Sequence, residues 1–256
     1  MSHTTPCLSF DAIRQDFGAL RVLDDVGFEV EAGQFVAVIG PSGCGKSTLV
    51  QMAAGLLMPT AGQVRHNGHL VRGVNAGIGL VPQQAQLLPW KTLMQNVVLP
   101  LELRRVPPAE RMAQARAAIA AVDLAGFEDS YPYQLSGGMQ KRASIARTLV
   151  YQPDAILLDE PFGALDAQTR MVMQRDLQAL VAAQGASVLL VTHDITEAVL
   201  LADTVVVLSR RPTRVLARIA IGLPRPRDVF QPFGIAGFAA AYDQVWAHVR
   251  GELVAA

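Results

Sequence analysis

A glycine-rich segment near the start of the chain could bind the phosphates of a nucleotide. Residues 40–47 read GPSGCGKS, which matches the P-loop pattern of two glycines followed by Lys and Ser or Thr. The segment follows an apolar run, Gln34–Ile39, and precedes an expected helix from Lys46 to near Gly55. At such a turn, glycines let backbone N–H groups face phosphate oxygens, and the helix N-terminus adds partial positive charge.

Two side chains of this loop have chemistry of their own. Lys46 would reach the β- and γ-phosphates, and the Ser47 hydroxyl would bind Mg²⁺. The alternative is a glycine turn that precedes a helix by chance, and the strand, loop and helix context argues against it. Cys44 is interpreted as a small tolerated side chain rather than a redox switch. The nucleotide-binding residues predicted here are Gly40, Pro41, Ser42, Gly43, Cys44, Gly45, Lys46, Ser47 and Thr48.

A second apolar run ends in two adjacent carboxylates. Ala155–Leu158 is followed directly by Asp159 and Glu160. A carboxylate at the end of a strand can complete the Mg²⁺ shell of a bound nucleotide, which we predict for Asp159. Glu160 could polarise a water molecule for in-line attack on the γ-phosphate. In isolation, the same pair is typical of a solvated strand end.

A third segment could also bind phosphate. Leu135–Gln140 reads LSGGMQ and precedes an expected helix that runs through Lys141, Arg142 and Arg147. Two adjacent glycines at a helix start form a second anion-binding nest. Because one chain needs only one P-loop, the second nest predicts a composite site across a dimer interface.

With these motifs, the chain resembles the ATPase subunit of an ABC transporter, and LSGGMQ is the most specific motif of that family. The resemblance covers about residues 8–228. It implies an α/β fold of the P-loop NTPase (ABC ATPase) type, with a RecA-like core, an N-terminal antiparallel β subdomain and an inserted α-helical subdomain at about 85–150. The implied organisation is an ATP-binding domain over 1–228 and a short C-terminal helical tail over 229–256.

The resemblance assigns further site residues. Gln83 is similar to the glutamine that touches Mg²⁺ and senses the membrane partner. Gln84 is a rival for that role, because Pro82 stands where relatives often have an aromatic residue. His193 resembles the histidine that contacts the γ-phosphate. Phe17 resembles the aromatic residue that stacks on adenine, with ordinary core packing as the alternative.

The resemblance also places each nucleotide between two copies of the chain. Asp166 ends the loop Gly163–Asp166, which resembles the loop through which the two subunits communicate. ATP and Mg²⁺ are the implied cofactors. The implied interface contacts to nucleotide are Ser136, Gly137, Gly138, Gln140 and Asp166. The implied catalytic residues are Glu160, His193 and Gln83, and the implied metal ligands are Ser47, Gln83 and Asp159.

The implied partners are a second ATPase subunit, an integral membrane permease and, indirectly, a periplasmic or lipoprotein solute-binding protein. The expected location is the cytoplasmic face of the bacterial inner membrane. Leu87–Trp90 is expected to line the permease-binding groove with Trp90 as an anchor, and packing within the helical subdomain is the alternative. Segments 88–97, 161–166 and 208–227 resemble the branch that imports nitrate, taurine and other sulfonates. A thiamine-precursor pyrimidine is the alternative substrate.

Composition limits the remaining function classes. Lys+Arg and Asp+Glu both number 22 and the pI is about 7.0, so the chain offers no general attraction for nucleic acid. A soluble ABC ATPase without a transport role is the alternative from another class, and the lack of heptads or a sequence repeat argues against it. Cys7 and Cys44 are too few for a disulfide framework, and the start lacks a secretory pattern. These features predict a soluble protein of a reducing compartment.

Overall fold

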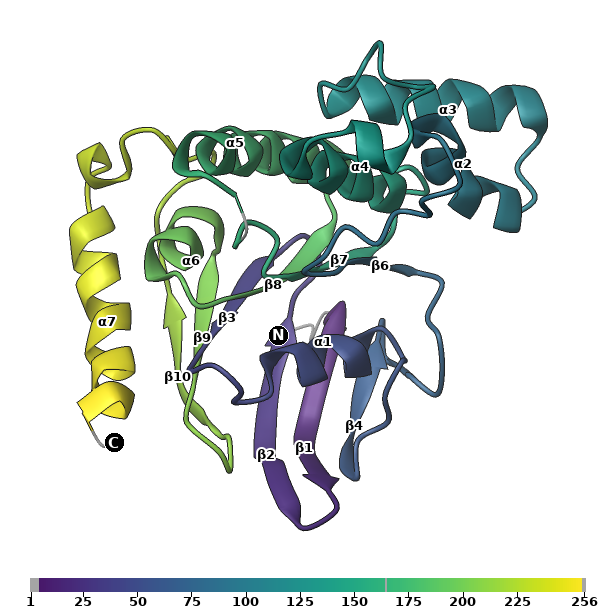
Figure 1. Ribbon diagram of the computed structural model, residues 1–256. Coiled ribbons are helices and arrows are strands. Elements are labelled where there is room, and N and C mark those ends of the chain that lie inside the picture. The colour runs from purple at the N-terminus through teal and green to yellow at the C-terminus, as the bar shows by residue number, and fades with distance from the viewer. Residues whose placement is uncertain (1–4, 164, 255–256) are drawn as a thin grey trace.

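The centre of the molecule is a mixed sheet of six strands (Figure 1). The computed structural model describes residues 5–163 and 165–254. The strands lie in the order β10-β9-β3-β8-β7-β6; β10 runs antiparallel to β9, and the other pairs are parallel. Every residue of β3 and β8 is buried, as expected for parallel strands covered on both faces. The bounds are β3 (Phe35–Ile39), β6 (Ile78–Val81), β7 (Ala155–Asp159), β8 (Ser187–Thr192), β9 (Thr204–Leu208) and β10 (Val215–Ala220).

A second, antiparallel sheet is built mainly from the N-terminal strands. Its strands lie in the order β2-β1-β4-β5. The helix α1 (Lys46–Ala53) contacts β4 of this sheet and β7 and β8 of the larger one, so it packs between the two. Alternating burial along β2 matches a strand with one face on the core and one in solvent. The bounds are β1 (Leu8–Phe17), β2 (Leu20–Val30), β4 (Ala61–His66) and β5 (His69–Leu70).

Helices between β6 and β7 form a separate layer, with α2 and α3 far from the N-terminal sheet (Figure 1). α2 (Leu93–Leu103), α3 (Pro108–Ala121) and α4 (Gly137–Leu149) pack on one another, and α4 also packs on β6. Their starts follow local chemistry. A reciprocal capping box joins Thr92 and Gln95 before α2, and Pro108 occupies the first turn of α3. A short 3₁₀ turn, η1 (Pro132–Gln134), precedes α4.

The remaining helices, α5 to α7, lie in the second half of the chain, after β7. α5 (Ala167–Gln184) lies between β7 and β8, and α6 (Ile195–Leu201) lies between β8 and β9. After a 3₁₀ turn, η2 (Pro232–Gly234), α7 (Phe238–Val254) packs against α6, β9 and β10. α7 has 17 residues and is longer than the short helix expected. Its length follows from burial of Phe238, Ala241 and Val245, which recur at helical spacing.

Candidate functional site

Four adjacent parallel strands bring most of the predicted site residues to one edge of the larger sheet. Gln83 follows β6, Asp159 ends β7, and His193 follows β8. The P-loop, residues 40–47, follows β3, which is the next strand in the sheet. Ligands of open α/β sheets bind outside the carboxyl ends of the strands, so this edge is the candidate site.

The P-loop owes its shape to a glycine that no other residue could replace. Gly45 has φ +108°, and a Cβ atom there would lie 2.7 Å from Leu23 Cδ2 and 2.8 Å from Val22 Cγ1. The adjacent Lys46 Nζ donates to the carbonyl oxygens of Gly40 at 2.8 Å and Pro41 at 3.0 Å. Its ammonium group therefore lies over the loop, where phosphate oxygens would be stronger, charged acceptors.

Cys44 lies on the inner side of this loop. Its side chain is buried, and the Thr213 hydroxyl donates to the Cys44 carbonyl at 2.6 Å. Burial raises the pKa of the Cys44 thiol, while the Lys46 charge acts in the opposite direction. A buried, protonated thiol is a poor redox switch, in line with the structural interpretation of this residue.

Ser47 and Asp159 are directly joined. Ser47 Oγ donates to Asp159 Oδ1 at 3.0 Å, although α1 and β7 are far apart in the sequence. Burial raises the pKa of Asp159, the charge of Glu160 acts in the same direction, and the Ser47 hydrogen bond opposes both. A hydroxyl and a carboxylate side by side are hard oxygen donors, which suit Mg²⁺. Within the described residues, no group of three or more His, Cys, Asp or Glu side chains could hold a metal by itself.

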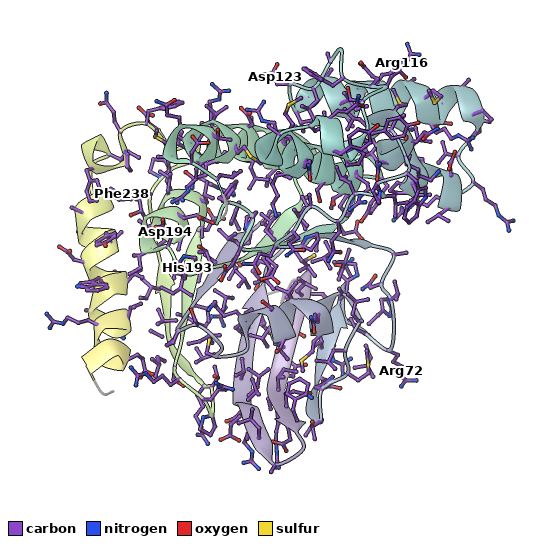
Figure 2. All side chains as sticks on the ribbon, in the orientation of Figure 1. Arg72, Arg116, Asp123, His193, Asp194 and Phe238 are labelled. Atoms are coloured by element: carbon purple, nitrogen blue, oxygen red, sulfur yellow. The ribbon has the colours of Figure 1, made fainter. Side chains whose placement is uncertain are left out.

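Glu160 is the centre of a second cluster. Gln83 Nε2 donates to Glu160 Oε2 at 3.2 Å, and His193 Nδ1 lies 3.4 Å from Glu160 Oε1. Figure 2 shows His193 near the middle of the molecule, close to α6. The geometry therefore places Gln83, rather than Gln84, beside the predicted base.

The backbone at Glu160 is strained. Its φ is +43°, a left-handed conformation that residues other than glycine seldom adopt. The Glu160 N–H donates to the Val191 carbonyl at 2.9 Å. Such a conformation costs about 1–3 kcal/mol and is retained mainly at functional sites.

Two basic residues of α4, for which the sequence predicted no role, donate hydrogen bonds to the loop that carries Gln83. Lys141 Nζ donates to the carbonyls of Pro82 at 2.6 Å and Gln83 at 3.0 Å. Arg147 donates to the carbonyls of Ala85 at 3.2 Å and Gln86 at 2.9 Å. Burial lowers the pKa of Lys141 to about 8. No signal in the sequence separates Lys141 and Arg147 from Arg142, the third basic residue of α4.

The LSGGMQ segment lies apart from these clusters. Ser136 is the N-cap of α4, with Oγ accepting from Met139 N at 3.3 Å. Gln140 Nε2 donates to the carbonyls of Pro132 at 2.9 Å and Leu135 at 3.1 Å, so it fixes the turn before the helix. Among the described residues, no hydrogen bond or ion pair joins Ser136, Gly137 or Gly138 to the P-loop.

Asp166 is placed as the N-cap of α5. Its Oδ1 accepts from the backbone N–H groups of Gln168 at 3.1 Å and Thr169 at 3.0 Å, and these bonds lower its pKa. Of the loop Gly163–Asp166, Ala164 lies outside the described residues. No bond among the described residues links Asp166 to the P-loop or to Glu160.

Two aromatic side chains resolve alternatives left open by the sequence. Phe17 ends β1 and is 48% exposed, so core packing is wrong for it. Trp90 is 70% exposed, so packing inside the helical layer is wrong for it, whereas Leu87 does pack against the core. A cavity of about 490 Å³ adjoins the glutamine loop, and Leu87, Pro89 and Lys141 contribute to its wall.

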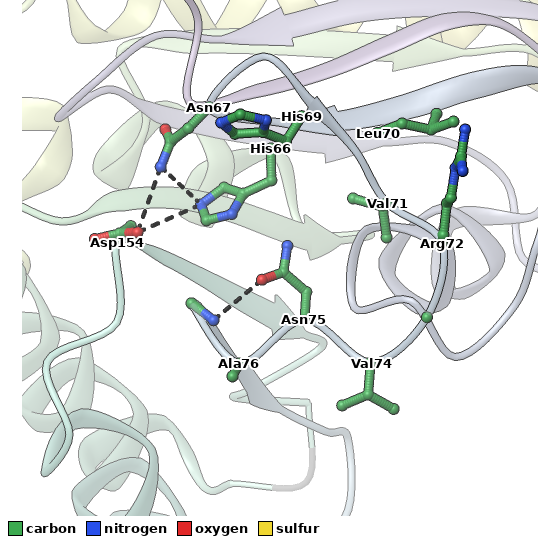
Figure 3. A pocket seen from close by; sticks show the side chains of 12 residues that line it. His66, Asn67, His69, Leu70, Val71, Arg72, Val74, Asn75, Ala76 and Asp154 are labelled. Carbon is green, nitrogen blue, oxygen red and sulfur yellow. Dashed lines mark hydrogen bonds and ion pairs between the residues drawn. The ribbon is translucent and has the colours of Figure 1, made fainter. Parts of the chain in front are cut away.

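A separate cavity lies where the two sheets meet (Figure 3). It has a volume of about 520 Å³, and none of the predicted site residues lines it. His66 Nε2 lies 3.8 Å from Asp154 Oδ2, and Asn67 Nδ2 donates to the same oxygen at 3.4 Å. Burial lowers the pKa of His66, and the charge of Asp154 opposes that shift. These contacts tie the end of β4 to the start of β7.

Comparison with known proteins decides the family. Residues 23–163 match the model of the ABC transporter family. The chain belongs to the ABC transporter family. It is accordingly an ABC ATPase, an enzyme that binds and hydrolyses ATP, and the predicted family and activity are confirmed.

Several curated relatives of this ABC ATPase align over most of their length. An uncharacterized ABC transporter ATP-binding protein of Methanocaldococcus jannaschii is 49% identical over 209 residues, 82% of this chain and 78% of the relative. An aliphatic sulfonates import ATP-binding protein of Shouchella clausii is 45% identical over 221 residues, 86% and 83% of the two chains. A taurine import ATP-binding protein of Chromobacterium violaceum is 46% identical over 205 residues, 80% and 78% of the two chains.

Solved structures agree on the fold. A dimeric ATP-binding cassette in a post-hydrolysis state, bound to ADP and Pi, matches with a TM-score of 0.75 at 30% identity, covering 84% of this chain and 98% of that one. The predicted α/β fold of the ABC ATPase type is thereby confirmed. Across the described part of this chain, the helices are too short or too polar to cross a bilayer.

Proposed function

We propose that the chain is the ATP-hydrolysing subunit of a bacterial importer that takes up a small solute, with aliphatic sulfonates and taurine as the leading substrates. Relatives named for these two uses, at 45% and 46% identity, support the class of substrate. Nitrate and a thiamine-precursor pyrimidine rest on sequence resemblance alone. The observation that carries the ATPase role is the joining of Ser47 to Asp159 and of Gln83 and His193 to Glu160 at one sheet edge.

In this proposal each side chain at the edge has one task. The P-loop N–H groups and Lys46 bind the phosphates. Glu160 accepts the proton of the attacking water, and Gln83 and His193 orient Glu160 and the γ-phosphate. Phe17, exposed at the end of β1, stacks on the base. Ser47, Asp159 and the Gln83 amide oxygen would hold Mg²⁺. When bound, the ion would neutralise the negative charge that develops on the phosphate oxygens.

The second copy of the chain supplies the remaining contacts. Ser136, Gly137 and Gly138 of one subunit would face the phosphates held by the P-loop of the other. The dimeric state of the structural relative supports this arrangement. Because ATP would lie between the two surfaces, its γ-phosphate favours the closed dimer and hydrolysis releases it.

The proposed partner of the dimer is an integral membrane permease at the cytoplasmic face of the bacterial inner membrane. Trp90 is exposed, and Pro89, which precedes it, lines the cavity at the glutamine loop; both support a docking surface for that partner. A solute-binding protein would deliver the substrate to the permease from the other side.

A growth experiment tests this function. A strain that lacks the chain is grown with taurine, an alkanesulfonate or sulfate as sole sulfur source, and is complemented with wild type or with Lys46→Ala. We expect the deletion strain to grow on sulfate but not on taurine or the alkanesulfonate. Wild type should restore growth on both sulfonates, and Lys46→Ala should not. Normal growth of the deletion strain on both sulfonates would contradict the substrate class, while leaving ATP hydrolysis by the purified chain to be measured separately.

A further inference from the structure

A small polar cavity lies directly beside the proposed base. Its volume is about 40 Å³, and Glu160, Arg170, Thr192, His193, Asp194 and Glu197 contribute to its wall. One water molecule needs roughly 10–15 Å³ and two or more polar partners. The cavity therefore has both the room and the polarity to hold water next to the Glu160 carboxylate.

Glu197, on α6, contributes a carboxyl group of which one oxygen has no partner in the described fold. The residue is only 5% exposed, and Oε1 has no hydrogen-bond partner among the described residues. Leaving such a buried acceptor unsatisfied costs about 1–3 kcal/mol. A water molecule in the cavity is the partner that would remove this cost.

Helix capping does not account for this carboxyl. Glu197 is at the third position of α6, and its N–H donates to the cap residue Asp194 at Oδ1, 3.2 Å away. In a full capping box the glutamate would accept from the cap N–H in return. Here the Asp194 N–H donates to Thr192 Oγ1 at 3.1 Å instead. The Glu197 side chain is thus available to the cavity.

Arg170, another residue in the wall of this cavity, also has an unpaired buried atom. Arg170 of α5 contacts Asp194 Oδ2 at 3.6 Å and the Leu165 carbonyl at 3.2 Å, but its buried Nε has no partner among the described residues. His193 lies 3.4 Å from the Glu160 carboxylate on another wall. Two residues that each have an unpaired buried polar atom therefore line one small cavity together with the proposed base.

The charge state of Glu197 follows from its surroundings. Burial raises the pKa of its carboxyl to about 8, and the charges of Asp194 and Glu160 act in the same direction, whereas Arg170 and a hydrogen bond with Thr192 oppose them. The neighbouring β3 has only apolar side chains, and no charged residue of α7 lines the cavity. At neutral pH the carboxyl keeps its proton, so it can donate a hydrogen bond to water instead of repelling Glu160.

We propose that Glu197 is a positioning residue, which binds water in this cavity and through it holds Glu160 and His193 in place for ATP hydrolysis. The inference rests on the proposed role of Glu160. Glu197 itself touches neither nucleotide nor the attacking water.

Two substitutions and a matched control test this role in the purified full chain. Glu197→Leu keeps the size but removes both hydrogen-bonding atoms, and Glu197→Gln keeps the shape with one donor and one acceptor. Gln174→Leu makes the same polar-to-leucine change at a buried residue of α5 outside the cavity. ATP affinity, kcat and KM are measured from about pH 6 to pH 9, because kcat reports groups in the bound complex.

We expect Glu197→Leu to lower kcat about tenfold, the loss that one missing hydrogen bond produces, with less than about a threefold change in ATP affinity. Glu197→Gln should recover most of that loss at neutral pH. The kcat of wild type should decline above about pH 8 as Glu197 ionises, and Glu197→Gln should lack that decline. Gln174→Leu should keep the wild-type kcat and pH profile.

Three outcomes would overturn the inference. One is a wild-type kcat in Glu197→Leu. If that variant does not fold, Glu197→Gln decides, and an alkaline decline equal to that of wild type would count against the proposal. A wild-type chain that binds ATP without hydrolysing it would overturn the proposed function together with this inference, whereas an active wild type with an unaffected Glu197→Leu overturns the inference alone.

Discussion

The P-loop edge and the LSGGMQ segment are both proposed to bind phosphate, but the chain prepares them differently. At the P-loop edge the side chains are already paired with one another, Ser47 with Asp159 and Gln83 with Glu160. In the LSGGMQ segment, the Ser136 hydroxyl caps its own helix, and the glycines contact none of those residues by hydrogen bonds within the described chain. In the proposed dimer, one region is an assembled half-site, and the other is a half-site that acts on the nucleotide of a second copy.

The difference has a topological cause. Four parallel strands in fixed register end at one edge, so the residues that follow them meet without a partner. The LSGGMQ segment instead begins a helix of the inserted layer, on which no strand end converges. Within the described residues, the Met139 N–H donates to Ser136 Oγ, whereas the N–H groups of Gly137 and Gly138 have no acceptor and can bind an anion from outside.

The largest effect should come from the assembled half-site. Glu160→Gln removes the proposed base while keeping size and hydrogen bonding, so we expect hydrolysis at least about 100-fold slower with ATP binding retained. Phosphate release and nucleotide binding are measured on the same preparation. Near-normal turnover in this variant would remove Glu160 from the role and would leave the paired edge without an assigned base.

A mixing experiment tests the offered half-site. Ser136→Arg should leave nucleotide binding by its own P-loop intact but slow hydrolysis about tenfold or more, and Lys46→Ala should lose both. In a mixture, a mixed dimer contains one intact site, made from the P-loop of the first variant and the LSGGMQ segment of the second. We expect about a quarter of the wild-type rate if the two sites of a twofold dimer act independently. No recovery on mixing would contradict a composite site.

A smaller effect is expected where the two regions are connected. Lys141→Met removes the donor to the Pro82 and Gln83 carbonyls, so the glutamine loop should lose protection from amide hydrogen exchange and kcat should fall about three- to tenfold. Arg142→Met is the matched control, because Arg142 contacts Asp123 instead. Equal loss of protection in both variants would show general loosening of α4 rather than a specific hold on the loop.

The smallest effect concerns stability. The pKa of Glu197 is about 8 in the folded chain against an ordinary value of 4.5, so the folded state binds the proton more tightly than the unfolded state. The stability contributed by this protonation is complete below about pH 4.5 and is lost as pH rises to about 8. The melting temperature of Glu197→Gln relative to wild type should therefore rise by a few degrees between about pH 5 and pH 8. A constant difference would indicate an ordinary pKa.

Much of the assembled half-site could be predicted from sequence because its residues directly follow apolar strands. Residues 40–47, Asp159 and His193 are all of this kind, and the parallel strands bring them together. The sequence left Gln84 as a rival of Gln83, because the two glutamines are adjacent and only the contact with Glu160 in the fold distinguishes them. Lys141 and Glu197 were given no role for a related reason. Their partners are backbone carbonyls or a cavity made by distant segments, and no local spacing encodes such contacts.

The helix α4 touches both regions, and that has a thermodynamic consequence. Its 13 residues form a rod about 20 Å long, with Ser136 at one end and Lys141 and Arg147 along its flank. If the arriving second copy shifts this rod, the carbonyls it holds shift with it. Linkage is reciprocal. If pairing of the two copies changes the free energy with which a partner binds the glutamine loop, that partner changes the free energy of pairing by the same amount. Binding of a partner at the glutamine loop of one chain would thus change the affinity of that chain for the second copy.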